Sequence, residues 1–160
     1  MDAAGNEQYG MKRRGVGREV YAMGCVRDTG TARGRGVSAT RDIEPGEMVE
    51  VCPVLFVAGD FDELPIELRR AVFAWGPLTG GPDANVIALG YGGIYNHANP
   101  ANLRYDADVE ARCLLFCAAE AIPAGTEMTI NFNCLDGGNV SDDDSWFRAV
   151  GLPAPTPTAA

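Results

Sequence analysis

The residues whose types suit binding or catalysis are few and lie far apart in this sequence. The only histidine, His97, follows Asn96 inside a polar cluster. Much earlier, Gly34 and Gly36 flank one arginine, and glycine, which has no Cβ, lets a backbone approach a ligand closely. Each feature is weak alone, because a lone histidine is usually structural and such glycines also form ordinary turns. No side chain stands out as a strong general base.

The cysteines give little support to a metal centre. None of the five forms the close CxxC pair of a zinc site. Cys113 and Cys117 lie in one apolar run, and in a strand they would share one face, where we expect them in the core. We therefore predict reduced, mostly buried thiols and no metal. A metal or redox protein using Cys113 and Cys117 is the alternative, although nothing supplies the remaining ligands.

Length and charge restrict the class of protein. The 160 residues suit one domain, and 46% hydrophobic with 22% charged residues is a globular composition. The net charge of −9 argues against a nucleic-acid binder and favours basic partners, unless it serves solubility alone. No apolar run approaches the roughly 18 residues of a membrane span, and the N-terminus lacks the apolar segment of a signal peptide. We expect an intracellular protein, in cytoplasm or nucleus, that is neither secreted nor bound to membranes.

The elements that would position these residues are mainly strands. Glycines and prolines interrupt nearly every apolar run, which favours a β-rich fold. One helix is expected over residues 62–75 with Asp62 as its cap, and a short strand or helical turn over 85–95. We expect a single domain over 19–150 between flexible tails at 1–18 and 151–160. The predicted strands cover 19–26, 37–40, 49–57, 112–119 and 127–132, with tight turns at 43–47 and 122–125.

Three segments, taken together, resemble the SET domain family in that family's order. They are GRGVSATRDIEPGEM (34–48), ALGYGGIYNHANPAN (88–102) and IPAGTEMTINF (122–132). The resemblance spans roughly residues 34–147 and is greatest to the short SET proteins of bacteria and algal viruses, which also carry Ala-Leu-Gly before the Asn-His pair. It implies a mainly β, β-clip-like fold with short helices and a knot-like threaded C-terminal segment.

The same resemblance implies a function. Members of the family are S-adenosylmethionine-dependent protein lysine N-methyltransferases, in which cofactor and lysine meet through a narrow channel. The expected partner is a lysine-containing basic protein or peptide, a histone tail being one candidate. Direct binding of nucleic acid is not expected, and a homodimer is left open.

Site residues are transferred from the family position by position. The resemblance assigns the transfer step to Tyr105 and Phe132. For Tyr91 and Tyr95, packing in the hydrophobic core is as open an alternative as a place in the lysine channel. The cofactor set is Arg35, Gly36, Val37, Asn96, His97, Trp146 and Phe147, and the lysine-channel set is Tyr91, Tyr95, Tyr105 and Ile130.

Two departures from the family pattern qualify this prediction. Phe132 stands where the closing strand usually ends in a tyrosine, whose hydroxyl would lie beside the transferred methyl group. The zinc-binding cysteines that follow many SET domains are also missing, since only Cys134 follows the strand. The loop over 135–144 is acidic, and either it is simply solvated or it faces a basic peptide. The alternative function is therefore a catalytically weak SET domain that binds cofactor or a basic peptide as an interaction module.

Overall fold

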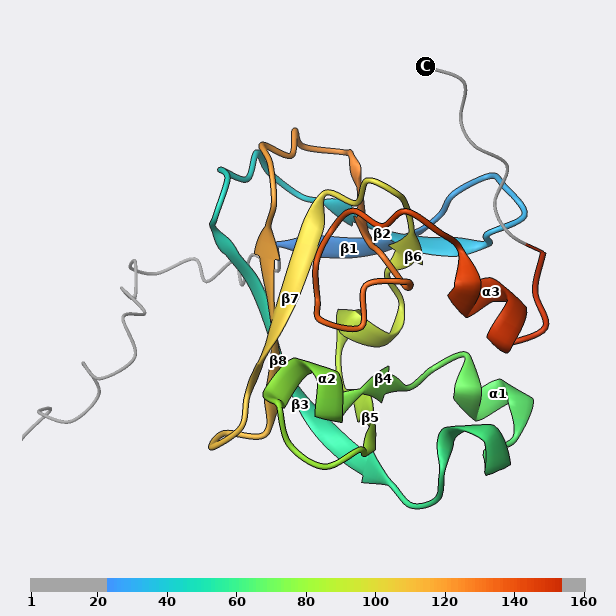
Figure 1. Ribbon diagram of the computed structural model, residues 1–160. Helices are drawn as coiled ribbons and strands as arrows, with labels where there is room; N and C mark the ends of the chain where they lie inside the picture. Colours follow the sequence, from blue (N-terminus) through green and yellow to red (C-terminus); the bar gives the residue numbers. More distant parts are fainter. Residues whose placement is uncertain (1–22, 154–160) are drawn as a thin grey trace, which may run out of the picture.

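The fold is mainly β, with short helices at its margins (Figure 1). The computed structural model describes residues 23–153. The tail expected over 1–18 lies outside the described residues, as does most of the one expected over 151–160. The smaller sheet has the strand order β1 (Gly24–Asp28), β2 (Arg35–Ala39), β9 (Glu127–Ile130), β6 (Asn96–His97). The larger sheet has the order β4 (Phe73–Ala74), β5 (Asn85–Ala88), β3 (Met48–Val57), β8 (Cys113–Ala118), β7 (Leu103–Asp108). The helical elements are η1 (Phe61–Glu63), α1 (Ile66–Arg69), α2 (Trp75–Thr79), η2 (Tyr91–Gly93) and α3 (Ser145–Ala149).

Strand β9 determines how the smaller sheet is built. It pairs with β2 in the antiparallel sense and with β6 in the parallel sense. The glycine-rich segment and the Asn-His pair, far apart in sequence, therefore flank the same strand. This pairing positions the candidate site.

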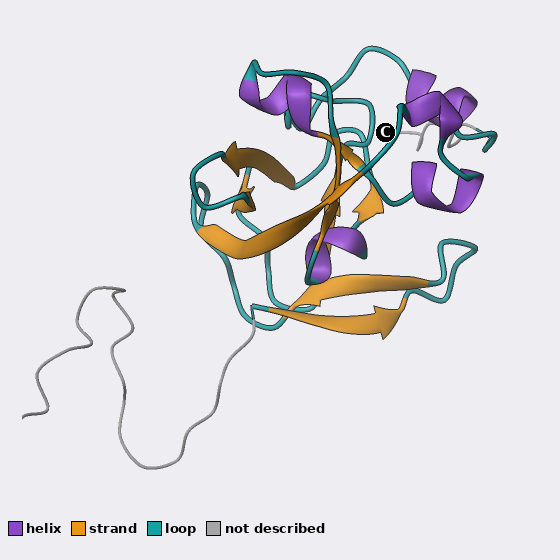
Figure 2. Cartoon of the chain, turned by 90° about the horizontal axis from the view of Figure 1, so that it is seen from below, coloured by secondary structure: helices purple, strands orange, loops and turns teal. Residues whose placement is uncertain are grey.

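The core lies between the two sheets, as the view from below shows (Figure 2). Alternate residues of β8 point inward, so that Leu114 and Phe116 are fully buried. From the other sheet, Val37, Met128 and Ile130 join the same buried cluster. Packing of the two sheets against each other thus fixes β9 relative to the larger sheet.

The two Ile-x-x-Gly turns pair with each other. Ile43 and Ile122 exchange two backbone hydrogen bonds of 2.9 Å and form an isolated antiparallel bridge. Gly46 and Gly125 close the turns with φ of 79° and 83°, which glycine adopts without strain. The paired turns therefore join the two sheets at the points where β3 and β9 begin.

The strands predicted over 37–40, 49–57, 112–119 and 127–132 are confirmed within a few residues, and the described part of the first strand begins at Gly24. The single helix over 62–75 is wrong. That stretch forms η1, α1, β4 and the start of α2, and Asp62 lies inside η1 instead of capping a helix. Pro65 is the physical reason. It keeps Leu64 extended (ψ 145°), and it has no backbone N–H with which to donate a hydrogen bond to a carbonyl of the preceding turn. A short strand or a helical turn was expected over 85–95, and the stretch forms both, as β5 and η2.

The cysteine prediction is partly wrong. All five thiols are free, but Cys117 is only half-buried. The inward face of β8 carries Leu114, Phe116 and Ala118 instead. Cys113, on the outward face, is nevertheless buried, at 8% exposure.

Candidate active site

One corner of the site joins β2, β6 and β9. The Asn96 side-chain amide donates to the Arg35 carbonyl (3.0 Å) and to Glu127 Oε1 (2.7 Å). A Cβ on Gly36 would overlap the Glu127 carboxylate and approach Asn96 Nδ2 to 2.9 Å. Only glycine therefore fits position 36 without moving both neighbours. Arg33 lies 3.8 Å from the same carboxylate and balances its charge.

His97 is buried and held between two partners. Its Nδ1 accepts a hydrogen bond from the Phe132 backbone N–H (3.1 Å), so that nitrogen carries no proton. Its Nε2 lies 3.8 Å from Asp144 Oδ1. Burial lowers the pKa of His97, and the Asp144 carboxylate only partly opposes this. The imidazole is therefore neutral at pH 7, with its proton on Nε2.

An aromatic cluster covers this histidine. The His97 ring meets Phe147 edge-on, with centroids 4.9 Å apart, and lies 5.3 Å from Phe132. Phe132 in turn lies 4.7 Å from the ring of Trp146. Strand β9 thus leads into a wall of aromatic rings completed by α3.

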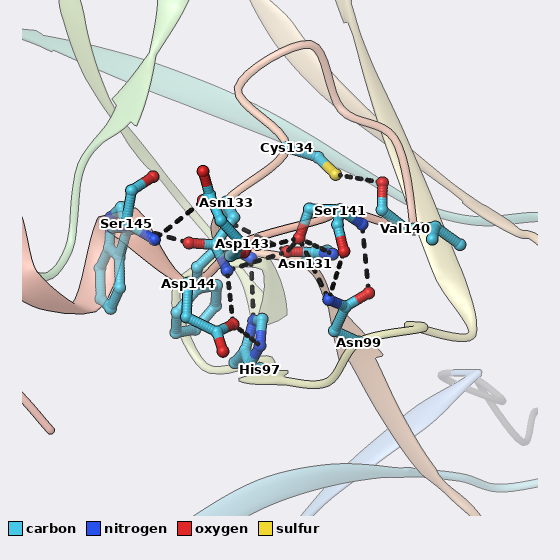
Figure 3. A network of polar contacts seen from close by, with 12 residues as sticks. His97, Asn99, Asn131, Asn133, Cys134, Val140, Ser141, Asp143, Asp144 and Ser145 are labelled. Atoms are coloured by element: carbon cyan, nitrogen blue, oxygen red, sulfur yellow. Dashed lines mark hydrogen bonds and ion pairs between the residues drawn. The ribbon is translucent and has the colours of Figure 1, made fainter. Parts of the chain in front are cut away.

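A polar network ties the loop over 131–146 to the segment after β6 (Figure 3). Asn99 donates to the Ser141 carbonyl (2.7 Å) and accepts from its N–H (3.1 Å). Asn131 donates to Ser141 Oγ (3.0 Å), and Asn133 accepts from the Trp146 N–H (2.9 Å). These bonds anchor α3 over His97. The knot-like threading of this segment stays a prediction.

A narrow pocket of about 60 Å³ opens beside the aromatic wall. It contains four of the residues predicted for the channel or the transfer step, together with one cationic side chain, Arg70. Its lining is Arg70, Ala71, Val72, Phe73, Ala74, Gly92, Gly93, Tyr95, Tyr105, Ile130, Phe132, Leu135 and Trp146. The space suits a slender chain, not a bulky ligand.

Both tyrosines of the pocket already donate their hydroxyl protons. Tyr95 donates to Glu50 Oε2 and Tyr105 to the Cys134 carbonyl, each at 3.0 Å. Burial, first of all, raises the pKa of both phenols above the ordinary value. Each is therefore a neutral group that can still accept a hydrogen bond.

Glu50 supports one wall of the pocket and was not predicted from the sequence. It lies on β3 and accepts from the Tyr91 N–H (2.8 Å) as well as from the Tyr95 hydroxyl. Together with burial, its charge raises the pKa of the Cys52 thiol to about 12, so that thiol stays protonated. A carboxylate within the otherwise apolar run over 49–57 was the signal that could have identified it.

A wider groove of about 720 Å³ adjoins the narrow pocket. Val72, Ala74, Leu135 and Trp146 line both, so the two spaces lie side by side. The remaining lining is Gly59, Asp60, Phe61, Asp62, Pro77, Asp83, Ala84, Asn85, Asn133, Ser145 and Ala149. Its aspartates, missed in the sequence, make the groove acidic.

The structure therefore gathers most of the predicted site residues into two adjoining places. Arg35, Gly36 and Val37 lie across β9 from Asn96 and His97, and the rings of Trp146 and Phe147 adjoin that histidine. Tyr95, Tyr105, Ile130 and Phe132 line the narrow pocket. Tyr91 does not line it and instead binds Glu50 through its backbone. The role of each toward a ligand stays a prediction.

Within 23–153, no group of three or more His, Cys, Asp or Glu side chains could hold a metal ion. Of the helices formed by those residues, none is long and apolar enough to cross a bilayer.

Comparison with known proteins gives one family. Residues 34–133 match the sequence model of the SET domain. Curated protein sequences yield no match.

Solved structures share the fold at low sequence identity. A Plasmodium falciparum protein described as a candidate histone methyltransferase has 19% identity and a TM-score of 0.56, over 71% of this chain and 95% of that one. The Neurospora SET domain protein DIM-5, a histone lysine methyltransferase, has 24% identity and a TM-score of 0.50, over 66% of this chain and half of its own length. A chain of the active polycomb repressive complex 2 in its basal state has 22% identity and a TM-score of 0.51, over 68% of this chain and 15% of its own.

Proposed function

This chain belongs to the SET domain family, and we propose that it is an S-adenosylmethionine-dependent protein lysine N-methyltransferase. The observation that carries the proposal is the position of Phe132. Phe132 lines the narrow pocket, while its N–H donates to His97 Nδ1 and its ring contacts the His97 ring. A lysine in the pocket and a cofactor beside His97 would therefore both lie next to this one residue, close to each other as group transfer requires.

The corner around Gly36 suits the proposed cofactor. The missing Cβ at position 36 leaves room for the Glu127 carboxylate and the Asn96 amide beside the backbone over 35–37, and together these groups would face the cofactor. Asn96 and His97 offer amide and imidazole groups, and Trp146 and Phe147 offer aromatic faces beside them. When bound there, S-adenosylmethionine would supply an electrophilic methyl group on a sulfonium.

The pocket would help the lysine amine to lose its proton. A free lysine has a pKa of about 10.4, so its neutral form must be favoured before it can attack. Apolar and aromatic walls disfavour the ammonium by desolvation, and the Arg70 cation disfavours it further. Tyr95 and Tyr105 can orient the amine only as acceptors, because each already donates its proton.

The acidic groove supports a basic peptide as the substrate. It adjoins the pocket, and Asp60, Asp62 and Asp83 lie on its lining. A lysine-containing segment of a basic protein, such as a histone tail, would find complementary charge around its target residue. The Ala-Leu-Gly segment at 88–90 resembles the short SET proteins of bacteria and algal viruses, and we include this likeness in the proposal.

Incubation with labelled S-adenosylmethionine and a panel of basic proteins tests the proposed activity. We expect label on lysine side chains and less of it when Gly36→Ala replaces the wild type, because the added methyl group displaces the Glu127 carboxylate and the Asn96 amide. Gly81→Ala is the matched control, since its Cβ meets only the Thr79 hydroxyl at 3.2 Å. Absence of label on every protein of the panel would overturn the enzymatic assignment.

A second function is favoured by one observation. Phe132 has no hydroxyl, and both tyrosines of the pocket already bind protein acceptors. A SET domain that binds cofactor or a basic peptide with little turnover fits these facts. Calorimetry and the labelling assay together distinguish the two functions. An interaction module would release or absorb heat on binding cofactor or a basic peptide, but would transfer no label to any protein.

A further inference from the structure

The outward face of the larger sheet is apolar and exposed. On β3, Met48, Val51 and Leu55 are 43%, 52% and 55% exposed. The registers place outward partners beside them on neighbouring strands: Cys117 beside Met48, Leu115 beside Val51, and Ile87 beside Leu55. We call these six residues, with exposed Pro53, the outer apolar face. Monomeric proteins rarely expose such a contiguous patch without a partner.

No described element packs over this face. In Figure 1, α1 and α3 lie to the right of β7 and β8, while α2, whose Trp75 belongs to the buried core cluster, overlaps the lower part of β3. The strands are long enough to present a flat surface, since β3 runs for ten residues. Flat apolar sheet faces of this kind pack against other sheets in β-sandwiches.

The pattern of charge and shape on this face is self-complementary. Glu50, Phe116 and Tyr105 form one row across three strands, and all three side chains belong to the inward side. On the outward side, Val51, Leu115 and Asp106 lie on one flank of that row, and Met48, Cys117 and Arg104 lie on the other.

A two-fold axis along the row exchanges the two flanks. It would set Arg104 against the partner's Asp106, with apolar side chains facing apolar side chains between them. Both charged residues are exposed at the β7 edge. A surface that meets its own copy must be complementary to itself in this way.

We infer that the outer apolar face is the interface of a homodimer in which the larger sheets of two copies pack face to face. A stable interface buries about 800 Å² on each partner, so the contact would have to include the β7 edge as well as the outer apolar face. The inference is independent of the proposed function, because none of the outer-face residues lines the narrow pocket or the groove.

Sedimentation and light scattering of the full chain over a range of concentrations test this inference. We expect a dimer, and Val51→Lys should give a folded monomer with an unchanged circular dichroism spectrum. Val109→Lys is the matched control, since Val109 is 58% exposed outside the named face, and it should leave the dimer intact.

Charge reversal at the β7 edge tests the orientation. Arg104→Asp and Asp106→Arg should each weaken the dimer about tenfold, and the double variant should restore it. A wild type that stays monomeric at every concentration would overturn the inference, as would a dimer insensitive to Val51→Lys. A third outcome would also overturn the inference. If the protein is a monomer and removal of residues 1–22 increases hydrogen exchange in β3 and β8, the outer apolar face is covered by that segment and not by a second copy.

Discussion

Phe132 connects the two halves of the candidate site through a single residue. Its backbone N–H fixes the tautomer of His97, its ring packs on Trp146, and its edge lines the narrow pocket. Where relatives carry tyrosine, this residue keeps the ring and lacks the hydroxyl. The positions of its neighbours do not depend on that hydroxyl, because they are fixed by backbone bonds and ring contacts.

Restoring the hydroxyl is the first test at this scale. Phe132→Tyr should increase methyl transfer on the order of 10²-fold, the effect of one preorganised hydrogen-bonding group beside the reacting atoms. Cofactor affinity should change little, because the N–H to His97 is retained. Turnover, cofactor affinity and melting temperature are measured together.

Phe147→Tyr is the matched control. It adds a hydroxyl to the same aromatic cluster but not to the pocket lining, so turnover should not rise. Unchanged or lower turnover of Phe132→Tyr with a reduced melting temperature would mean that the new hydroxyl is buried without a partner, at about 1 to 3 kcal/mol. Phe132 would then not mark a weakened centre.

The buried imidazole of His97 gives a pH dependence of stability. Its pKa in the folded state lies below the value of about 6.5 expected in the unfolded chain. The unfolded state therefore binds a proton first, and the stabilisation present above pH 6.5 is lost as the pH falls toward the folded pKa. The slope from this group is at most about 1.4 kcal/mol per pH unit.

Urea unfolding between pH 7 and 5.5 measures this effect. The free energy of unfolding of the wild type should fall across the interval, while His97→Asn should show a flatter profile because its amide does not titrate. Asn can still offer an oxygen to the Phe132 N–H, which makes the variant a fair comparison. Parallel profiles for the two proteins would show that His97 does not titrate differently on folding.

At the scale of elements, sequence patterns predicted the strands that have strong local signals. The runs forming β3 and β8 are largely apolar and bounded by turns, so their existence follows from composition. Strand β7 was not predicted, although buried Leu103 and Tyr105 alternate with exposed Arg104 and Asp106 in the pattern of a half-buried strand. Helix α3 is too short for periodicity to reveal, and it is held by the loop network instead of by propensity.

The candidate site shows the same division between local and distant information. Motif resemblance located Gly36, Asn96 and His97, but residue spacing alone could not show that β9 would bring them together. Glu50 and Glu127 were missed because their roles arise from partners 41 to 45 and 31 residues away. The groove aspartates likewise acquire meaning only when η1 and the segment before β5 face each other.

Asn102 acts as a substitute for a strand neighbour. Its amide oxygen accepts from the Thr129 N–H (2.8 Å), and its amide nitrogen donates to the Glu127 carbonyl (2.8 Å). Both bonds are made to β9 at and before Thr129, which is the register partner of Asn96 at the start of β6. Asn102→Ala should lower the free energy of unfolding by about 3 kcal/mol, because it leaves buried backbone groups without partners.

Asn99→Ala is the matched control for this prediction. Asn99 also donates to one backbone carbonyl and accepts from one N–H, both of Ser141, but it is exposed. Water can replace those bonds, so the loss should stay near or below about 1 kcal/mol. Equal losses for the two variants, measured by urea unfolding, would contradict the strand-neighbour role of Asn102.

At the scale of the molecule, a net charge of −9 sets a field that attracts basic partners from a distance. The groove concentrates part of this charge beside the pocket, through Asp60, Asp62 and Asp83. Overall charge and local groove charge therefore make separable contributions to peptide binding. The first acts equally over the surface, while the second acts only on residues that flank the target lysine.

Neutralising the groove separates the two contributions. The triple variant Asp60→Asn, Asp62→Asn and Asp83→Asn should raise KM for a basic peptide about tenfold, because three pairs at roughly 0.5 kcal/mol each sum to one decade. The control removes the same charge elsewhere, at exposed Glu44, Glu110 and Glu120 by change to Gln, and should raise KM far less. Both variants are compared at low and high salt, where screening should shrink the difference between wild type and the groove variant. If the two triple variants raise KM equally, the groove does not contact the residues around the target lysine, and the attraction comes from net charge alone.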